Sequence, residues 1–70
     1  MNVKFNGKVI EVNHKVSLAE VLADQASLQG FSLEASVTAV NLQFVHKEDY
    51  SQYQVEDGDD IELLTAVVGG

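Results

Sequence analysis

Hydrophobic and polar residues alternate at the start of the chain, and the alternation is interrupted once. In Asn2–Phe5, alternate side chains share one face of an extended segment, as they do on a β-strand. Asn6-Gly7 follows, and this pair is a strong hairpin signal because a type I′ turn needs a positive φ at both positions. The alternation resumes in Lys8–Val12. We therefore predict that the chain begins with a β-hairpin.

A helical pattern follows the hairpin, and it begins with a clear capping signal. Ser17 is a favoured N-cap residue, and Glu20, three residues later, completes a capping box that satisfies free backbone N–H groups of the first turn. Apolar residues then recur at spacings of three and four, which is typical of a helix with one buried side. We predict a helix that ends between residues 25 and 28, with Gly30 in the loop beyond it.

The alternation of hydrophobic and polar residues that is typical of β-strands returns in the second half of the chain. We expect, in order, a strand at Ser36–Val40, a turn at Asn41–Gln43, a short strand at Phe44–Val45, one helical turn and a loop within His46–Gln54, a turn at Asp57–Asp59 and a last strand at Asp60–Ala66. The chain has no proline, internal repeat or low-complexity linker. This order predicts one α+β domain, in which a mixed sheet of four to five strands packs on one main helix.

The alternation also predicts which side chains face the helix. The residues expected on the inner face are Val3, Phe5, Ile10, Val12, Leu18, Val21, Leu22, Ile61, Leu63 and Thr65. The last strand places Glu62, Leu64 and Ala66 on the opposite, free face. An outward leucine beside acidic residues is a candidate contact for a partner protein, so Leu64 and Glu62 are candidate docking residues. The alternative is an ordinary exposed leucine, since apolar atoms form much of any protein surface.

Composition and charge narrow the classes of partner. The chain has 70 residues and no cysteine, which predicts one small domain without disulfides or thiolate metal ligands. Eleven acidic residues against four lysines give a net charge of −7. This charge disfavours nucleic acids and anionic membranes, and it favours a basic patch on a partner protein. Without a membrane-length apolar run or a signal-peptide pattern, we expect a cytoplasmic protein that is a monomer on its own.

Side chains suited to catalysis are sparse. His14 and His46 are the two histidines, and each lies alone in a predicted loop. The acidic run from Glu56 to Glu62 lacks the alternating acidic positions of a calcium loop, so we interpret it as a tight turn with solvated carboxylates. No glycine-rich loop precedes the helix. We therefore predict no bound cofactor, no metal site and no enzymatic activity.

The remaining feature is the end of the chain, Val67-Val68-Gly69-Gly70. Glycines bury no side chain and lose much entropy when they are ordered, so we expect a flexible tail at residues 67–70 on a domain at residues 1–66. Four extended residues span at most about 13–14 Å. Such a slim tail can enter an enzyme that activates the Gly70 carboxylate, with Gly69 providing access and the two valines acting as a spacer. The alternative is a frayed end without a function.

Several segments in the second half of the chain carry a family pattern. They are Ala39–Asn41, Val45, Lys47–Tyr50, Val55–Asp59, Ile61–Leu63 and Ala66–Gly70. An Asp-Gly-Asp turn with an Ala-Val-X-Gly-Gly ending, in a chain of this length, resembles the ThiS-type sulfur carriers of thiamin biosynthesis. These are ubiquitin-like proteins of the β-grasp fold. The chain departs from the family at Leu42, often glycine there, at His46-Lys47, often Pro-Arg, and at Tyr50, often tryptophan.

The resemblance implies a specific chemistry at the chain end. A ThiF-like adenylyltransferase would adenylate the Gly70 carboxylate with ATP and magnesium. Sulfur from a cysteine desulfurase would then replace AMP and leave a terminal thiocarboxylate. A ThiG-like thiazole synthase would take this sulfur. In this interpretation Val67, Val68 and Gly69 contact the partner enzymes, and the protein itself is a co-substrate.

Three alternatives remain open. The small subunit of molybdopterin synthase uses the same terminal chemistry, but that family usually has a longer chain and prolines before its Val-Ala-Gly-Gly ending, whereas this chain has no proline. A ubiquitin-like modifier would be joined through Gly70 to lysine side chains of target proteins. A non-reactive β-grasp interaction module would have terminal glycines without a chemical role.

Overall fold

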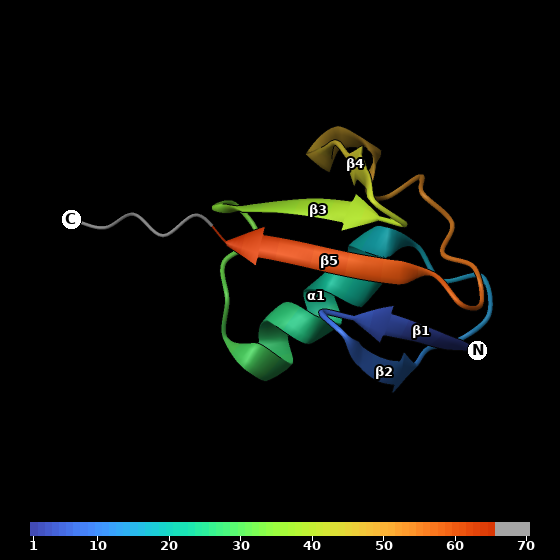
Figure 1. The fold of residues 1–70 in the computed structure, drawn as a ribbon. Coiled ribbons are helices and arrows are strands. Elements are labelled where there is room, and N and C mark those ends of the chain that lie inside the picture. The colour runs from blue at the N-terminus through green and yellow to red at the C-terminus, as the bar shows by residue number, and fades with distance from the viewer. Residues whose placement is uncertain (66–70) are drawn as a thin grey trace.

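Residues 1–65 are described by the structure, a computed structural model, and within them five strands form one mixed sheet with α1 packed on one face (Figure 1). The elements are β1 (Asn2–Phe5), β2 (Lys8–Glu11), α1 (Leu18–Gln29), β3 (Ser36–Val40), β4 (Gln43–Val45), the 3₁₀ helix η1 (Lys47–Asp49) and β5 (Asp60–Thr65). The strand order across the sheet is β2-β1-β5-β3-β4. The predicted α+β class and mixed sheet are thereby confirmed, and β5, the last strand among the described residues, is the central strand of the sheet.

The predicted hairpin joins β1 and β2 in antiparallel register. Asn6 and Gly7 have φ values of 50° and 83°, as a turn of this type requires. β2 ends at Glu11, one residue before the predicted end. Val12 still exchanges hydrogen bonds with Met1, one in each direction at 2.8 Å. Val12 lies outside β2 because its partner is the first residue of the chain, where the ladder ends.

α1 begins after Ser17, as predicted. The Ser17 hydroxyl accepts from the Glu20 N–H group and donates to the Glu20 carboxylate, both at 3.2 Å. The helix runs to Gln29, beyond the predicted range, because Gly30 determines its end: it has a φ of 76° and donates its N–H to the Ala26 carbonyl at 2.8 Å. No helix in the described part of the chain has the length and apolar character needed to cross a membrane.

The core lies between α1 and the sheet. Its buried residues are Val3, Phe5, Val16, Leu18, Val21, Leu22, Val40, Tyr50, Val55, Ile61 and Leu63. Three residues predicted to face inward are less buried. Ile10 and Val12 are half-buried because Ile10 lies on β2, the edge strand of the sheet, and Val12 directly follows it. Thr65 is exposed, and it forms the last pair of the β3–β5 ladder among the described residues.

The segment between β4 and β5 is held by a buried tyrosine. Tyr50 follows η1, the predicted single helical turn, and its hydroxyl donates to Thr38 Oγ1 at 2.9 Å. The backbone carbonyls of Tyr50 and Tyr53 accept from the N–H groups of Ala19 and Leu18, at 3.0 and 2.9 Å. These N–H groups have no partner within the helix because they lie in its first turn. The loop therefore supports the start of α1 as well as covering the core.

The turn between β3 and β4 is tighter than predicted. Asn41 and Leu42 alone form it, with φ values of 51° and 68°, and Gln43 already belongs to β4. A leucine in the left-handed region is strained by contact between its Cβ and the backbone. Leu42 also remains 85% exposed, so burial does not compensate for the strain.

Replacing Leu42 by glycine relieves this strain, and we expect the free energy of unfolding to rise by about 0.5–1 kcal/mol. Urea denaturation measures the change. Leu28→Gly is the matched control, because Leu28 is also exposed but lies inside α1, where glycine costs about 1 kcal/mol. Opposite signs for the two variants are expected. A loss of stability in Leu42→Gly would show that the turn is not strained.

Candidate functional site

The predicted reacting group lies outside the described residues. This holds for Gly70, for the predicted contact residues Val67, Val68 and Gly69, and for the predicted domain boundary at Ala66. What the structure describes is the strand that precedes them, β5, and the surface around its end (Figure 1). The candidate site is therefore the end of β5 with the side chains that border it.

β5 is supported along its length by different partners. Its parallel pairing with β1 ends at Ile61, whose carbonyl accepts from the Asn6 N–H at 2.9 Å. The Asn6 side chain continues this support, because its Oδ1 accepts from the Leu63 N–H at 2.8 Å. On the other side of β5, all residues from Ile61 to Thr65 pair with β3. The side chain of Asn6, in the hairpin turn, thus continues the hydrogen bonding to β5 two residues beyond the last pair of the β1–β5 ladder.

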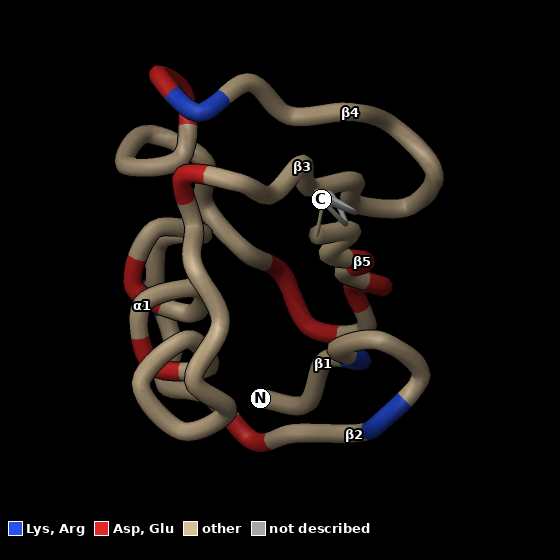
Figure 2. The backbone as a smooth tube through the Cα atoms, turned by 90° about the vertical axis from the view of Figure 1, so that its left-hand side faces the viewer, with Lys and Arg blue, Asp and Glu red and all other residues tan. Residues whose placement is uncertain are grey.

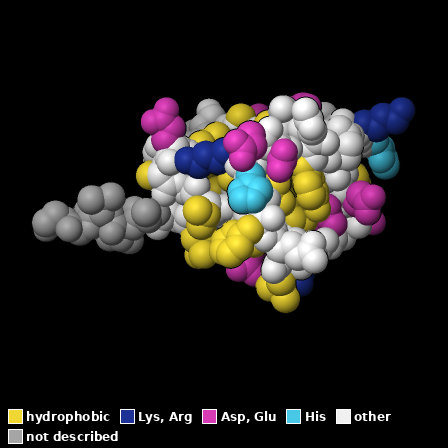
Figure 3. Space-filling view, turned by 90° about the horizontal axis from the view of Figure 1, so that it is seen from above, with side chains coloured by type: hydrophobic (Ala, Val, Ile, Leu, Met, Phe, Trp, Pro, Cys, Tyr) yellow, Lys and Arg dark blue, Asp and Glu magenta, His cyan; other side chains and the backbone are white. Residues whose placement is uncertain are grey.

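An exposed apolar strip lies on the free face of the sheet beside the end of β5. Leu64 is 60% exposed and pairs directly with Val37, which is 50% exposed. On the same face of β3, Ala39 pairs with Phe44 of β4, which is 74% exposed. We call Val37, Ala39, Phe44 and Leu64 the outer apolar strip. Figure 3, which looks onto the β4 side of the molecule, shows hydrophobic side chains gathered on this part of the surface.

The two candidate docking residues lie in or beside the outer apolar strip. Leu64 faces outward, as the alternation predicts, and Glu62 is half-buried on the same face opposite Ala39. The sequence reasoning missed Val37 and Phe44. Their signal was present, because the alternation in the third strand puts Val37 outward, but only the pairing of β3 with β4 and β5 brings them beside Leu64. A docking role for these residues remains a prediction.

The carboxylates of the acidic turn before β5 are not all solvated, in contrast to the interpretation from the sequence. Asp59 is buried, and its carboxylate accepts from Asn41 Nδ2 at 3.0 Å and from the Glu56 N–H at 2.8 Å. The Asn41 Oδ1 in turn accepts from the Asp60 N–H at 3.0 Å. Burial raises the pKa of Tyr53, and the charges of Asp59 and Glu56 raise it further. The interpretation is wrong for Asp59, because this carboxylate binds the donors that fix the start of β5.

The histidines and the acidic side chains do not gather into a ligand set. His14 and His46 are exposed in separate loops. Among residues 1–65, no group of three or more histidine, cysteine or acidic side chains is placed to hold a metal ion.

This arrangement, a mixed sheet with the last strand at its centre and one helix across a single face, defines the ubiquitin-like β-grasp class. A comparison with family models adds the particular family: the model of the ThiS family matches residues 3–70, and the chain belongs to this family. The resemblance predicted from the closing segments is thereby confirmed. Membership supports a role as a sulfur carrier in thiamine biosynthesis.

Solved structures agree with this assignment. The crystal structure of the thiamine biosynthesis protein (ThiS) from Geobacter metallireducens is 28% identical in sequence, with a TM-score of 0.80 and coverage of 100% of both chains. The NMR solution structure of a thiamine biosynthesis protein from Geobacter metallireducens is 26% identical, with a TM-score of 0.73 and coverage of 100% of this chain and 88% of that one. A comparison with curated proteins finds no match.

Replacing Asn6 by glycine tests how β5 is held. Glycine tolerates the positive φ at this position but removes the acceptor of the Leu63 N–H. We expect the free energy of unfolding to fall by about 1 kcal/mol and the Leu63 amide to exchange faster with solvent. Amide hydrogen exchange followed by NMR measures the second effect. Asn13→Gly, in an exposed loop, is the control. Unchanged exchange at Leu63 in the Asn6 variant would contradict this role of the side chain.

Proposed function

We propose that this protein carries sulfur as a thiocarboxylate on Gly70 and delivers it for the synthesis of the thiazole of thiamin. The observation that carries the proposal is the direct continuation of the central strand, β5, into the ending Ala66–Gly70 in a chain of the ThiS family. β5 is paired on both sides and carries two buried core residues, Ile61 and Leu63. The reacting end therefore follows directly from a firmly held part of the domain.

The first step of the proposed chemistry activates the carboxylate. A carboxylate is a poor electrophile, because displacement would require an oxide ion to leave. A ThiF-like adenylyltransferase would join a Gly70 oxygen to the α-phosphorus of ATP and release pyrophosphate, with magnesium balancing the phosphate charge. A closed site that excludes water protects the acyl adenylate from hydrolysis. Terminal glycines without a Cβ are suited to entering such a site.

The second step replaces AMP by sulfur. A persulfide sulfur, supplied through a cysteine desulfurase, would attack the carbonyl carbon of Gly70, and AMP would leave to give an acyl disulfide. A thiol reductant would then cleave the S–S bond of this intermediate, which releases the terminal thiocarboxylate and leaves the donor thiol and the reductant joined as a disulfide. The chain has no cysteine, so no side-chain thiol competes as the carrier of the sulfur. A ThiG-like thiazole synthase would then take the sulfur, with deoxyxylulose phosphate and a glycine-derived imine as co-substrates. We expect the carrier to act as a monomer in the cytoplasm.

The outer apolar strip supports a docking surface for these partner enzymes. It borders the end of β5, so an enzyme that binds the strip meets the start of the tail. An exposed cluster of apolar side chains is a common feature of interaction sites. The net charge of −7 favours a partner with basic residues around an apolar patch. Leu64 and Val37 would supply the apolar contact, and Glu62 a charged one.

The intact mass of the protein tests the proposal directly. The full chain is incubated with a ThiF-like enzyme, ATP, magnesium, a cysteine desulfurase, cysteine and a thiol reductant. We expect a mass gain equal to the replacement of one oxygen by sulfur, confined to the C-terminal peptide. An unchanged mass with an enzyme of proven activity would contradict the proposal. Isopeptide-linked adducts would identify a protein modifier instead.

Deletion of Gly70 provides the matched control. The shortened chain still ends in a glycine carboxylate, but the reacting group is displaced by one residue. We expect the sulfur transfer to be lost, because the carboxylate no longer reaches the adenylating site, and the melting temperature to stay within the error of wild type. A large fall in melting temperature would assign the tail a structural role.

Replacing Leu64 by lysine tests the docking surface. We expect the KM for the carrier in the adenylation reaction to rise about tenfold, since loss of a central apolar contact weakens binding. The turnover number should change little, because the tail is intact. Val9→Lys is the control, because Val9 is 61% exposed and lies on β2, away from the outer apolar strip. Equal KM values for the two variants would exclude Leu64 from the docking surface.

A further inference from the structure

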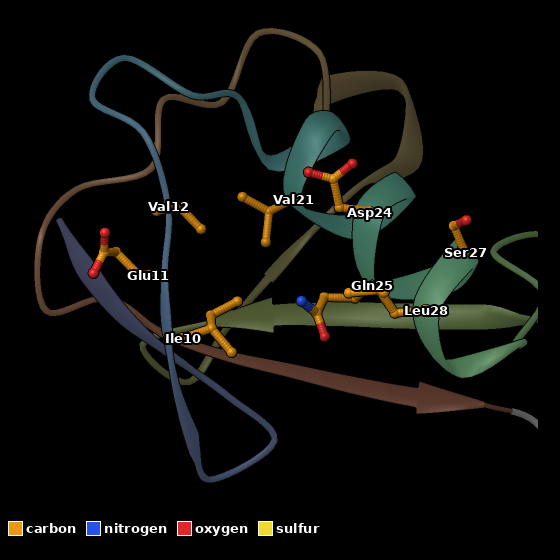
Figure 4. Close-up of a pocket in the computed structure, with 8 residues that line it drawn as sticks. All are labelled: Ile10, Glu11, Val12, Val21, Asp24, Gln25, Ser27 and Leu28. Atoms are coloured by element: carbon orange, nitrogen blue, oxygen red, sulfur yellow. The ribbon is translucent and has the colours of Figure 1, made fainter.

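A groove runs between β2 and α1, on the helix side of the sheet, away from the outer apolar strip. Three adjoining hollows form it, and they share lining residues. Figure 4 shows the central hollow, in which Ile10 and Gln25 point toward each other and Val12 and Val21 lie beside them. The groove continues past Leu28, which is 78% exposed, at one end. At the other end it reaches Glu20.

The backbone of β2 is open toward this groove. β2 is the outermost strand in the order of the sheet, so no strand among residues 1–65 pairs with its outer side. Val12 exchanges both of its backbone hydrogen bonds with Met1. Paired residues in an antiparallel ladder alternate, so Ile10 and Lys8 also direct their backbone groups toward β1. Val9 and Glu11 therefore direct their N–H and C=O groups away from β1.

Glu11 shows that this free backbone borders the groove. Glu11 belongs to the lining of the central hollow, but its side chain points away from it (Figure 4). Its contribution to the lining is therefore its backbone. An edge strand with free N–H and C=O groups is a template for the pairing of another strand. The groove thus combines a hydrogen-bonding edge with an apolar floor, which is the combination that binds extended peptides.

The charges around the groove favour one class of peptide. Glu20 and Asp24 lie on α1, where Glu20 lines one end of the groove and Asp24 lines both this end and the central hollow, and Figure 2 shows the acidic residues of this helix. Lys8 lies at the opposite end, beside Leu28. The chain as a whole carries a net charge of −7. A segment with basic residues at the end that meets Asp24 is therefore complementary to the groove.

We propose that the groove between β2 and α1 binds an extended, apolar segment of a partner protein with lysine or arginine at one end. The segment pairs with the free backbone of Val9 and Glu11 as an additional strand. Side chains on a strand alternate, so every second one points toward α1 and contacts Ile10, Val12 and Leu28. Its basic end lies beside Asp24. This site is separate from the outer apolar strip, so the carrier can bind a second protein segment while its tail is engaged elsewhere.

A designed peptide probes the site. It alternates valine and threonine over six residues, carries two lysines at one end and has blocked termini. It is titrated into the isotope-labelled full chain and followed by NMR. We expect saturable shift changes confined to β2 and α1, and slower hydrogen exchange at the Val9 and Glu11 amides. Shift changes on the outer apolar strip, or none that saturate, would overturn the proposal.

Two control peptides distinguish strand pairing from nonspecific binding. One has proline in place of the third and fifth residues of the alternating segment, which removes N–H donors. The other has glutamates in place of the lysines. We expect both to bind at least about threefold more weakly at low salt. Equal binding of the proline peptide would exclude strand addition, and equal binding of the glutamate peptide would exclude a basic segment.

Variants of the protein complete the test. Val9→Pro removes a backbone N–H group that does not bond to β1, and we expect it to weaken peptide binding about tenfold. Val9→Thr keeps this N–H group, and we expect it to leave peptide binding unchanged. Leu28→Gln removes an apolar contact and is compared with Ala23→Gln, on an exposed part of the same helix. Equal binding within both pairs would overturn the proposal. Dimerisation of the free chain that Val9→Pro abolishes would identify a second copy as the occupant.

Discussion

The position of β5 between β1 and β3 is the constraint on which the rest of the structure depends. β5 buries Ile61 completely and leaves Leu63 only 7% exposed, and both pack under α1. Because side chains on a strand alternate, a shift of one residue would turn these two outward and Leu64 inward. The side chains of Asn6 and Asn41 bind the backbone of β5 near its two ends. The same register therefore builds the core, exposes the outer apolar strip and determines where the tail begins.

Local signals in the sequence predicted most of the elements, and non-local contacts account for what was missed around the candidate site. Asn6-Gly7 and the Ser17 cap act within a few residues, so the hairpin and the helix start could be predicted. The burial of Asp59 could not, because its partner Asn41 is distant in sequence. The outer apolar strip was missed for the same reason: Val37, Phe44 and Leu64 become neighbours only when their three strands pair. The tail was predicted from composition and resemblance alone, and it lies outside the described residues.

One helix cannot cover both faces and both edges of a five-stranded sheet, and this limit creates the two candidate surfaces. α1 covers the inner face, which leaves the outer apolar strip on the other. It also stops short of covering β2, which leaves the groove and the free backbone of Val9 and Glu11. An open edge invites aggregation, and charged residues reduce this risk. Lys8 and Glu11 on β2, with the net charge of −7, serve this purpose while still permitting a complementary segment to bind.

Recognition and reactivity are separated in the proposed function. Among residues 1–65, the polar side chains that stand out, such as Asp59 and Asn6, are occupied in holding β5, and none forms a catalytic group with its neighbours. The reactive carboxylate belongs to a glycine that contributes no side chain to the core. In this proposal the chemistry at Gly70 makes no demand on the packing of the core. In the proposed function several enzymes handle the same chain end in turn, so their discrimination would come from surfaces of the domain such as the outer apolar strip.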